Sequence, residues 1–153
     1  MKIVLDSSFF FYDFPVEGDL YTTPSVCDEL IDIRSRGQFE KYCVLGLRVV
    51  CPDSAALLLV DNAARKTGDR GVISGTDRDL IALTLALGPG TTLYTDDFAI
   101  QNVAGKLGLE ISPMLQRKAK QICRRYRCSG CRKFYDHDGE CPVCGAEIKR
   151  KLK

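Results

Sequence analysis

The sequence of 153 residues has no tryptophan, one histidine and no apolar run long enough to cross a membrane. A membrane-spanning helix needs about 20 consecutive apolar residues. The N-terminus also lacks the charged start, apolar stretch and small-residue cleavage site of a signal peptide. We therefore expect a soluble, cytoplasmic protein that has no membrane partner. The hydrophobic content of 45% is enough for one sizeable core and a small appendage, and the oligomeric state stays open.

Eight cysteines are present, and without a secretion signal they are poorly explained as disulfides. Two C-x-x-C pairs, "CSGC" at 128–131 and "CPVCG" at 141–145, are separated by nine residues. Four thiolates in tetrahedral geometry form a closed structural zinc site, and such a short segment needs the metal in order to fold. A redox dithiol is disfavoured because neither pair lies in a βαβ pattern. We predict Zn²⁺ binding by these residues: Cys128, Cys131, Cys141 and Cys144.

The net charge of +2 is divided unevenly along the chain. Residues 1–116 contain 10 basic and 16 acidic side chains, whereas residues 117–153 contain 12 basic and 4 acidic ones. A polyanion is attracted to clustered positive charge. The C-terminal part is therefore where we expect a polyanion to bind.

Apolar runs alternate with segments of helical period, which is typical of an α/β domain with a mainly parallel sheet. We predict strands at 3–5, 20–22, 48–51, 92–94 and 109–111. Helices are expected from Pro24 or Ser25 through "TPSVCDELIDIR", and at 39–46, 54–68, 76–88 and 98–108. The segments 34–41 and 66–77, rich in glycine and charge, are expected as loops. The predicted organisation is an α/β domain at 1–115, a basic linker helix at 116–125 and a zinc ribbon with a basic tail at 126–153.

Carboxylates recur where these strands end and helices begin. Asp6 follows the first strand, Glu29 lies in the helix after Pro24, Asp77 heads a helix, and two aspartates follow the strand at 92–94. Any one of them is explained as a helix cap or a solvated residue. The carboxyl ends of parallel strands meet at one edge of the sheet, however, and like charges gathered there repel one another unless a cation binds among them.

Carboxylate oxygens with no histidine nearby select Mg²⁺ or Mn²⁺ rather than zinc. An ion held in this way activates water and neutralises charge on a phosphodiester. The acidic set therefore predicts nuclease chemistry.

Four segments carry a family resemblance: "VLDSSFFF", "TTPSVCDELID", "ISGTDRDLIALTLAL" and "LYTDDFAIQNVAGKLG". In this order and spacing they resemble the four acidic motifs of PIN-domain ribonucleases, over residues 1 to about 115. With the cysteine pairs added, the chain is similar to the archaeal members of a ribosome-biogenesis endonuclease family that trims the 3′ end of small-subunit ribosomal RNA. The resemblance implies a PIN-like fold, a divalent-metal-dependent endoribonuclease, and precursor small-subunit rRNA in a pre-ribosomal particle as its partner.

The resemblance also implies roles for individual residues. The catalytic acids fall on Asp6, Glu29 and Asp77, and the fourth falls on Asp96 or Asp97, between which the sequence does not choose. The expected Mg²⁺ or Mn²⁺ ligands are Asp6, Asp77, Asp96 and Asp97. Hydroxyls of Ser7 or Ser8 and of Thr95 are candidates to hold water or phosphate or to cap a helix, and Asp79 is expected to lie outside the metal ligands.

The basic C-terminal part is expected to contact RNA through cations and exposed aromatic rings, as single-stranded RNA is usually bound. The candidates are Arg124, Arg125, Arg127, Arg132, Lys133 and Tyr135. Phe134 is expected in the small core of the ribbon, and His137 is expected in a loop because the four cysteines already complete a zinc site.

Three alternatives stand beside this prediction. A haloacid-dehalogenase-like phosphatase also begins with an aspartate after its first strand, but it has a second acid two residues later, where this chain has Ser8. A non-catalytic RNA-binding assembly factor is disfavoured because all four acidic positions are filled. A toxin-type PIN ribonuclease is a closer alternative, but such proteins rarely carry a zinc ribbon.

Overall fold

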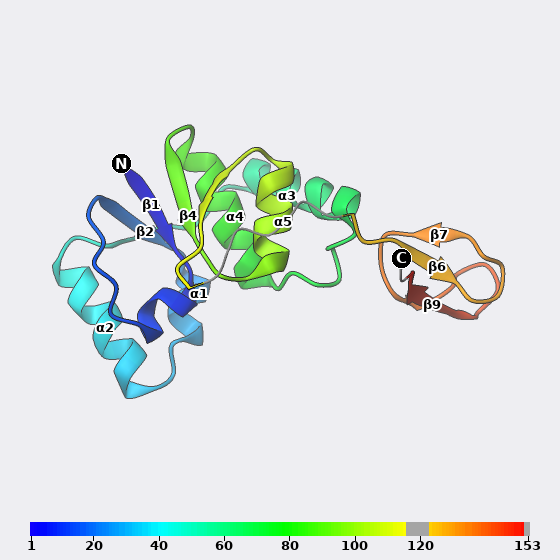
Figure 1. Cartoon of the computed structure of the whole chain (residues 1–153), viewed down its shortest axis with the longest axis horizontal. Coiled ribbons are helices and arrows are strands. Elements are labelled where there is room, and N and C mark those ends of the chain that lie inside the picture. Colours follow the sequence, from blue (N-terminus) through cyan, green and yellow to red (C-terminus); the bar gives the residue numbers. More distant parts are fainter. Residues whose placement is uncertain (116–122, 152–153) are drawn as a thin grey trace.

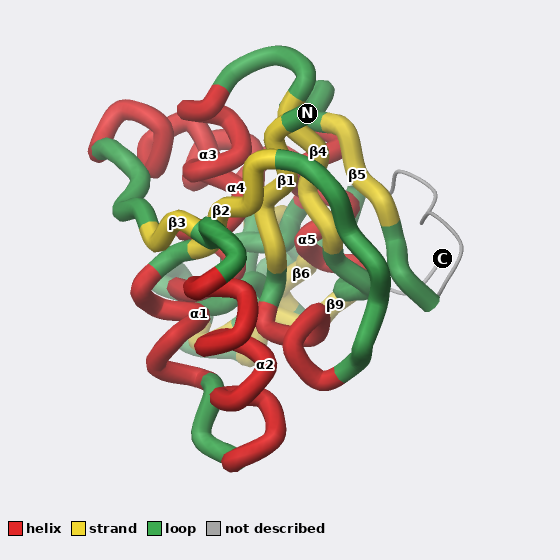
Figure 2. Tube along the Cα trace, turned by 90° about the vertical axis from the view of Figure 1, so that its left-hand side faces the viewer, coloured by secondary structure: helices red, strands yellow, loops and turns green. Residues whose placement is uncertain are grey.

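The computed structural model describes residues 1–115 and 123–151, which form two sheets. The first sheet consists of β1 (Lys2–Leu5), β2 (Asp19–Thr22), β3 (Arg48–Val49), β4 (Thr91–Tyr94) and β5 (Glu110–Ser112). All neighbouring strands are parallel, in the order β3-β2-β1-β4-β5, which Figure 2 shows across the view. This sheet and its helices are called the parallel module below, and they confirm the expected α/β class.

The helices of the parallel module are η1, a 3-10 helix (Ser7–Phe11), α1 (Pro24–Glu29), α2 (Ile33–Val44), α3 (Ser54–Thr67), α4 (Gly75–Leu87) and α5 (Phe98–Lys106). Figure 1 shows α3, α4 and α5 on one side of the sheet and η1 and α2 on the other. The central strands are therefore covered on both faces, which explains why their sequences are continuously apolar. Among the described helices, none has both the length and the hydropathy of a membrane span.

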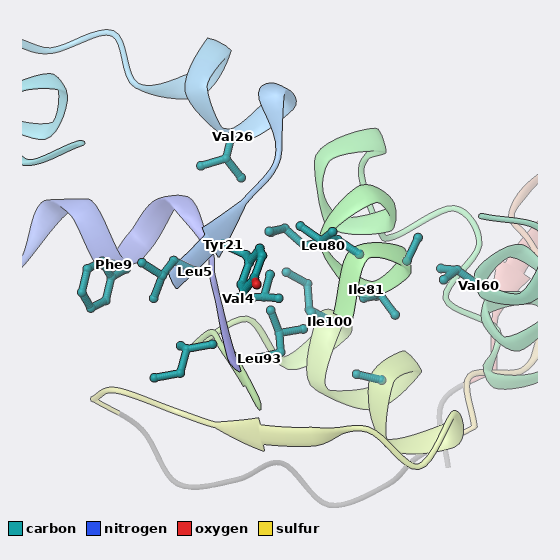
Figure 3. Packing of buried hydrophobic residues seen from close by; sticks show 14 of the residues in the cluster. Val4, Leu5, Phe9, Tyr21, Val26, Val60, Leu80, Ile81, Leu93 and Ile100 are labelled. Carbon is teal, nitrogen blue, oxygen red and sulfur yellow. The ribbon is translucent and has the colours of Figure 1, made fainter. Parts of the chain in front are cut away.

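The core continues through both faces of β1. Successive side chains of a strand point to opposite faces, and Figure 3 shows Leu5 beside Phe9 while Val4 points toward Leu80 and Ile100. All five side chains are fully buried. The apolar run that begins the sequence thus joins the two layers of helices through a single strand.

The caps of the helices agree with their sequences, with one correction. Asp53 accepts a hydrogen bond from the Ala56 N–H, and Gly68 ends α3 in the left-handed conformation. The helix expected from Pro24 through Arg34 instead ends at Glu29, and α2 begins at Ile33 because Asp32 caps it. Residues 34–41, expected as a loop, therefore lie within α2.

The second sheet, called the ribbon below, consists of β6 (Tyr126–Cys128), β7 (Phe134–Tyr135), β8 (Gly139–Glu140) and β9 (Glu147–Arg150). Its order is β7-β6-β9-β8, and all pairs are antiparallel. The linker helix expected at 116–125 falls mainly on residues 116–122, outside the described residues, and residues 123–125 have no helical assignment. The expected boundary between the two modules stays a prediction.

A buried ion pair joins the ribbon to the parallel module. The Arg124 guanidinium lies 2.5 Å from Asp69, whose other oxygen accepts a hydrogen bond from the Asn102 amide. The Arg124 N–H also donates to the Thr67 carbonyl at the end of α3. Asp69 is fully buried, and a buried carboxylate needs such partners. Arg124 therefore has a structural partner, and its predicted contact with RNA stays a prediction.

The core predicts a clear contrast between two helix positions. Ile81 is fully buried in α4, whereas Leu58 of α3 is 61% exposed. We expect Ile81→Ala to lower the free energy of unfolding by about 2–5 kcal/mol, because it leaves a cavity, and Leu58→Ala to change it by about 0.5 kcal/mol or less. Urea unfolding followed by far-UV circular dichroism measures both, and equal losses would contradict this packing.

Candidate active site and cysteine cluster

The side chain of Thr95 links the carboxyl ends of the two central strands. Leu5 of β1 pairs with Tyr94 of β4, so the next residues, Asp6 and Thr95, lie side by side. The Thr95 hydroxyl donates a hydrogen bond to Oδ2 of Asp6 at 2.7 Å and accepts one from the Asp97 N–H at 3.1 Å. One buried hydroxyl therefore positions two acidic residues at the same edge of the sheet.

Asp6 is a buried carboxylate at the end of β1. Burial raises the pKa of Asp6, and the hydrogen bonds from Thr95 and from the N–H and hydroxyl of Ser7 partly offset that rise. The negative charge of Asp77 raises it further. Such a group is ionised more easily when a cation lies beside it.

Asp77 lies in the first turn of α4 and does not head the helix as expected. Ser74 is the N-cap: its hydroxyl accepts from the Asp77 N–H at 3.1 Å, and Asp77 Oδ2 accepts from the Ser74 N–H at 2.7 Å. This reciprocal capping box fixes the carboxylate. Burial raises the pKa of Asp77, and the charges of Asp97 and Glu29 raise it further. The charge of Asp77 thus acts on Asp6, and the charges of Asp97 and Glu29 act on Asp77; these four residues are called the acidic cluster below.

Asp96 and Asp97 are adjacent in sequence but have different partners. Asp97 caps α5, where its Oδ1 accepts from the N–H groups of Ala99 and Ile100 at 2.7 and 3.2 Å. Oδ1 of Asp96 accepts from the N–H groups of Met114 and Leu115 at 2.8 and 3.0 Å, which holds the chain that follows β5. The charge of Asp97 acts on Asp77.

The two remaining acids border this cluster. Glu29 is the exposed last residue of α1, and α1 packs against both α4 and η1. Asp79, one turn of helix from the N-terminus of α4, accepts a hydrogen bond from the Ser25 hydroxyl at 2.8 Å and so ties α1 to α4. This contact positions Glu29 relative to Asp77.

Helix capping engages one of the two carboxylate oxygens of Asp77 and of Asp97. Within residues 1–115 and 123–151, Oδ2 of Asp97 and Oδ1 of Asp77 accept no hydrogen bond. Each side chain thus has one oxygen fixed by the backbone and one available to a ligand. Such oxygens are the ligands that divalent cations like Mg²⁺ prefer. Among the residues that the structure describes, however, the cysteines of the ribbon are the one group already placed to share an ion, so the carboxylates would have to move together to hold one.

The four predicted cysteines come together in the ribbon. The Sγ atoms of Cys128 and Cys144 lie 3.4 Å apart, those of Cys131 and Cys141 lie 3.7 Å apart, and all four fit within 4.8 Å of one another. Two sulfurs that share a tetrahedral zinc are separated by about 3.8 Å. A hydrogen bond from the Tyr135 hydroxyl lowers the pKa of Cys141 to about 6. The cluster is compatible with a zinc ribbon.

The two aromatic residues of β7 differ from the prediction, which placed Phe134 in the ribbon core and Tyr135 in contact with RNA. Tyr135 packs against the ribbon core, with its hydroxyl 3.0 Å from the sulfur of Cys141, and Phe134 is 57% exposed. The expectation that Phe134 fills the core is wrong, because successive residues of a strand face opposite sides. His137 lies in the turn after β7, as expected.

The remaining RNA-contact candidates are available at the surface. Arg125, Arg132 and Lys133 are exposed, and Arg127 is half-buried. The guanidinium of Arg127 lies 5.4 Å from the centre of the Phe134 ring. These positions are consistent with contact to a polyanion and do not themselves identify one.

Comparisons with known proteins agree with both modules. A family described as "PIN domain of ribonuclease" matches residues 3–87. A protein named endoribonuclease Nob1 from Pyrococcus abyssi is 40% identical over 153 residues, covering 97% of this chain and 92% of that protein. Ribonuclease VapC1 from Thermoplasma acidophilum is 39% identical over 88% of this chain and 69% of its own length. The yeast 20S-pre-rRNA D-site endonuclease NOB1 is 38% identical over 68 residues, which are 44% of this chain and 15% of that protein.

The raised pKa values predict how stability depends on pH in the absence of Mg²⁺ and Mn²⁺. A carboxyl whose pKa is higher in the folded than in the unfolded protein favours folding as the pH falls through the folded value. Since Asp6 is such a group, wild type should gain stability relative to Asp6→Asn as the pH falls from about 7 to about 5. Urea unfolding at each pH measures this difference, and a difference independent of pH would contradict the burial of the charge.

Proposed function

We propose that this chain, which belongs to the PIN-domain ribonuclease family, is an endoribonuclease that cleaves precursor small-subunit ribosomal RNA at its 3′ end. The observation that carries the proposal is the joining, in one chain, of the carboxylate cluster and the four-cysteine ribbon. A relative named endoribonuclease Nob1 matches across 97% of the chain, so the similarity includes both modules. The name of the yeast relative supports a ribosomal RNA precursor as the substrate class.

The proposed metal ligands of the active site are Asp6, Asp77 and Asp97, and the proposed ion is Mg²⁺ or Mn²⁺. When bound, the ion supplies Lewis acidity, which lowers the pKa of a water molecule and neutralises charge on the phosphodiester. Asp96 is left out of this set because its carboxylate holds the backbone of Met114 and Leu115.

The residues of the chain supply position and proton transfer. Thr95 and Ser7 fix the Asp6 carboxylate, and the capping box fixes Asp77. Glu29, which is exposed at the end of α1, is the residue that we propose accepts the proton of the attacking water. Attack in line with the departing 3′-oxygen leaves a 5′-phosphate and a 3′-hydroxyl.

The proposed ion of the ribbon is Zn²⁺, bound by Cys128, Cys131, Cys141 and Cys144. It supplies folding free energy to a sheet whose buried core contains only four residues besides two partly buried neighbours. The basic surface of the ribbon then holds RNA near a cluster of carboxylates that would by itself repel it. The partner that we propose is a precursor rRNA within a pre-ribosomal particle.

A cleavage assay tests the activity and distinguishes the two adjacent aspartates. The substrate is RNA that spans the mature 3′ end of small-subunit rRNA, with Mn²⁺ or with chelator. We expect Asp6→Asn and Asp97→Asn to lower the cleavage rate by at least about 100-fold, because each removes an oxygen of the reacting centre. Asp96→Asn keeps one acceptor for its backbone partners and should stay within about 3-fold of wild type.

The possible outcomes separate the parts of the proposal. Loss of cleavage in Asp96→Asn with activity retained in Asp97→Asn would reverse the assignment of the fourth acid. Metal-dependent cleavage only at other positions would retain the endoribonuclease and reject the 3′-end substrate, which favours a toxin-type ribonuclease. RNA that binds but is never cut would favour a non-catalytic assembly factor.

The zinc assignment is tested with two cysteines of different surroundings. Cys141 belongs to the cluster and is buried, whereas Cys51 is exposed and lies outside it. We expect Cys141→Ser to lose bound zinc and the dispersed amide NMR signals of residues 126–150, with the helical circular dichroism of the parallel module retained. Cys51→Ser should keep both properties. Full zinc content in Cys141→Ser, measured by mass spectrometry, would refute this site.

A further inference from the structure

We propose that a strip of basic residues and one phenylalanine, which begins on α3 of the parallel module and crosses onto the ribbon, binds single-stranded RNA with one base stacked on Phe134. The strip consists of Arg65, Lys66, Arg125, Arg127, Phe134 and Lys151. The inference rests on the proposed function for the identity of the polyanion. It adds a binding site to which both modules contribute, beyond the RNA contacts of the ribbon alone.

A groove lies where the end of α3 meets the ribbon. Its volume is about 620 Å³, and Arg65, Lys66, Arg125 and Phe134 are among the residues that line it. Figure 1 shows the end of α3 beside the chain that enters β6. Among the described residues that line the groove, Asp136 is the one carboxylate, and it lies 3.9 Å from the Arg70 guanidinium. The groove therefore carries a positive charge supplied by two separate parts of the chain.

Phe134 connects this groove to a second hollow on the ribbon. Its ring is exposed and lies 5.4 Å from the Arg127 guanidinium and 5.7 Å from the Lys151 ammonium. Arg127 and Lys151 also line the second hollow, of about 420 Å³. That hollow is further lined by Arg132, Lys149 and Arg150. The cations thus continue on both sides of one exposed aromatic ring.

This combination favours an unpaired nucleic acid strand over an acidic protein. Cations spaced along a groove follow a phosphate backbone, and an exposed ring between them offers a stacking surface for a base. The Phe134 side chain is not needed in the ribbon core, which Tyr126, Tyr135 and Ile148 fill. An acidic peptide would use the charges but not the ring.

The ion pair between Asp69 and Arg124 holds the two walls of the groove together. The Arg124 side chain is only 14% exposed, and its charge is matched by the fully buried Asp69. Gly68 has a φ of +76°, and a Cβ at this position would collide with the Arg124 carbonyl. Close backbone contact of this kind fixes the groove before RNA arrives, which reduces the entropy lost on binding.

The strip also leads toward the carboxylates. Helices α3 and α4 pack against each other, and the short turn at 68–74 carries the chain from the end of α3 to Ser74, the cap of α4. Asp77 lies in the first turn of α4. The segment that follows the cationic end of α3 thus leads directly to the helix that carries Asp77, and RNA lying along the strip would reach the carboxylates from this side.

An RNA-binding measurement tests the strip. A labelled, unstructured RNA of about 12 nucleotides is titrated with the zinc-loaded full chain, and fluorescence anisotropy reports binding in the absence of Mg²⁺ and Mn²⁺. Lys106 provides a matched control, because Lys66 and Lys106 are exposed lysines in the last turns of their helices. We expect Arg65→Ala/Lys66→Ala to weaken binding about 10-fold and to reduce the slope of log K against log salt by about 1.4, which corresponds to two lost phosphate contacts. Lys106→Ala should change neither quantity.

Phe134→Leu separates stacking from charge. This variant keeps an apolar side chain at an exposed position and removes the ring, so we expect about 10-fold weaker binding with an unchanged salt slope. The strip is refuted if the double variant weakens binding no more than Lys106→Ala. It is also refuted if double-stranded RNA or polyglutamate binds as tightly as the single strand and Phe134→Leu has no effect.

The failure of this inference and that of the proposed function are distinguishable. The anisotropy measurement needs no cleavage, so it reports on the strip even if the 3′-end substrate is wrong. In the cleavage assay, Arg65→Ala/Lys66→Ala should raise KM about 10-fold while kcat at saturating RNA is retained, because these residues bind RNA away from the reacting atoms. A lower kcat with unchanged KM would overturn the assignment of Arg65 and Lys66 to RNA binding.

Discussion

The hydrogen bond from Thr95 to Asp6 is the contact on which the site depends. It joins residues 89 positions apart in the chain, and the same hydroxyl accepts from the Asp97 N–H. The parallel pairing of β1 with β4 places the two segments side by side, and the buried hydroxyl then fixes their orientation. Without it, the buried Asp6 carboxylate would lose a hydrogen bond that lowers its pKa and partly offsets the effect of burial.

The protein therefore holds the carboxylates of the acidic cluster near one another although their negative charges repel. Burial raises the pKa of Asp6 and Asp77, and neighbouring carboxylates add to the rise at each. The caps of η1, α4 and α5 offset part of this destabilisation through backbone N–H groups. A cation offsets the rest when it binds. The proposed metal binding would use the same side chains that cap the helices, because each carboxylate has two oxygens.

Much of the fold, and the gathering of the four cysteines, was predictable from the sequence because local signals were strong. The five parallel strands follow from short apolar runs, and the cysteine cluster follows from its spacing. Other features depend on tertiary structure: Asp96 accepts hydrogen bonds from the distant N–H groups of Met114 and Leu115, whereas the adjacent Asp97 caps α5. Likewise, which of Phe134 and Tyr135 faces outward depends on the pairing of a two-residue strand. The Arg124 ion pair, too, required knowledge of where Asp69 is buried.

The location of a bound Mn²⁺ ion tests the central claim most directly. Crystals of the zinc-loaded chain grown with Mn²⁺, measured at the manganese absorption edge, reveal the ion by anomalous scattering. We expect a peak within about 2.2 Å of carboxylate oxygens of Asp6, Asp77 or Asp97, the distance at which such oxygens bind small divalent ions, and no contact with Asp96. A peak coordinated by Asp96, or manganese bound only elsewhere on the molecule, would contradict the proposed arrangement.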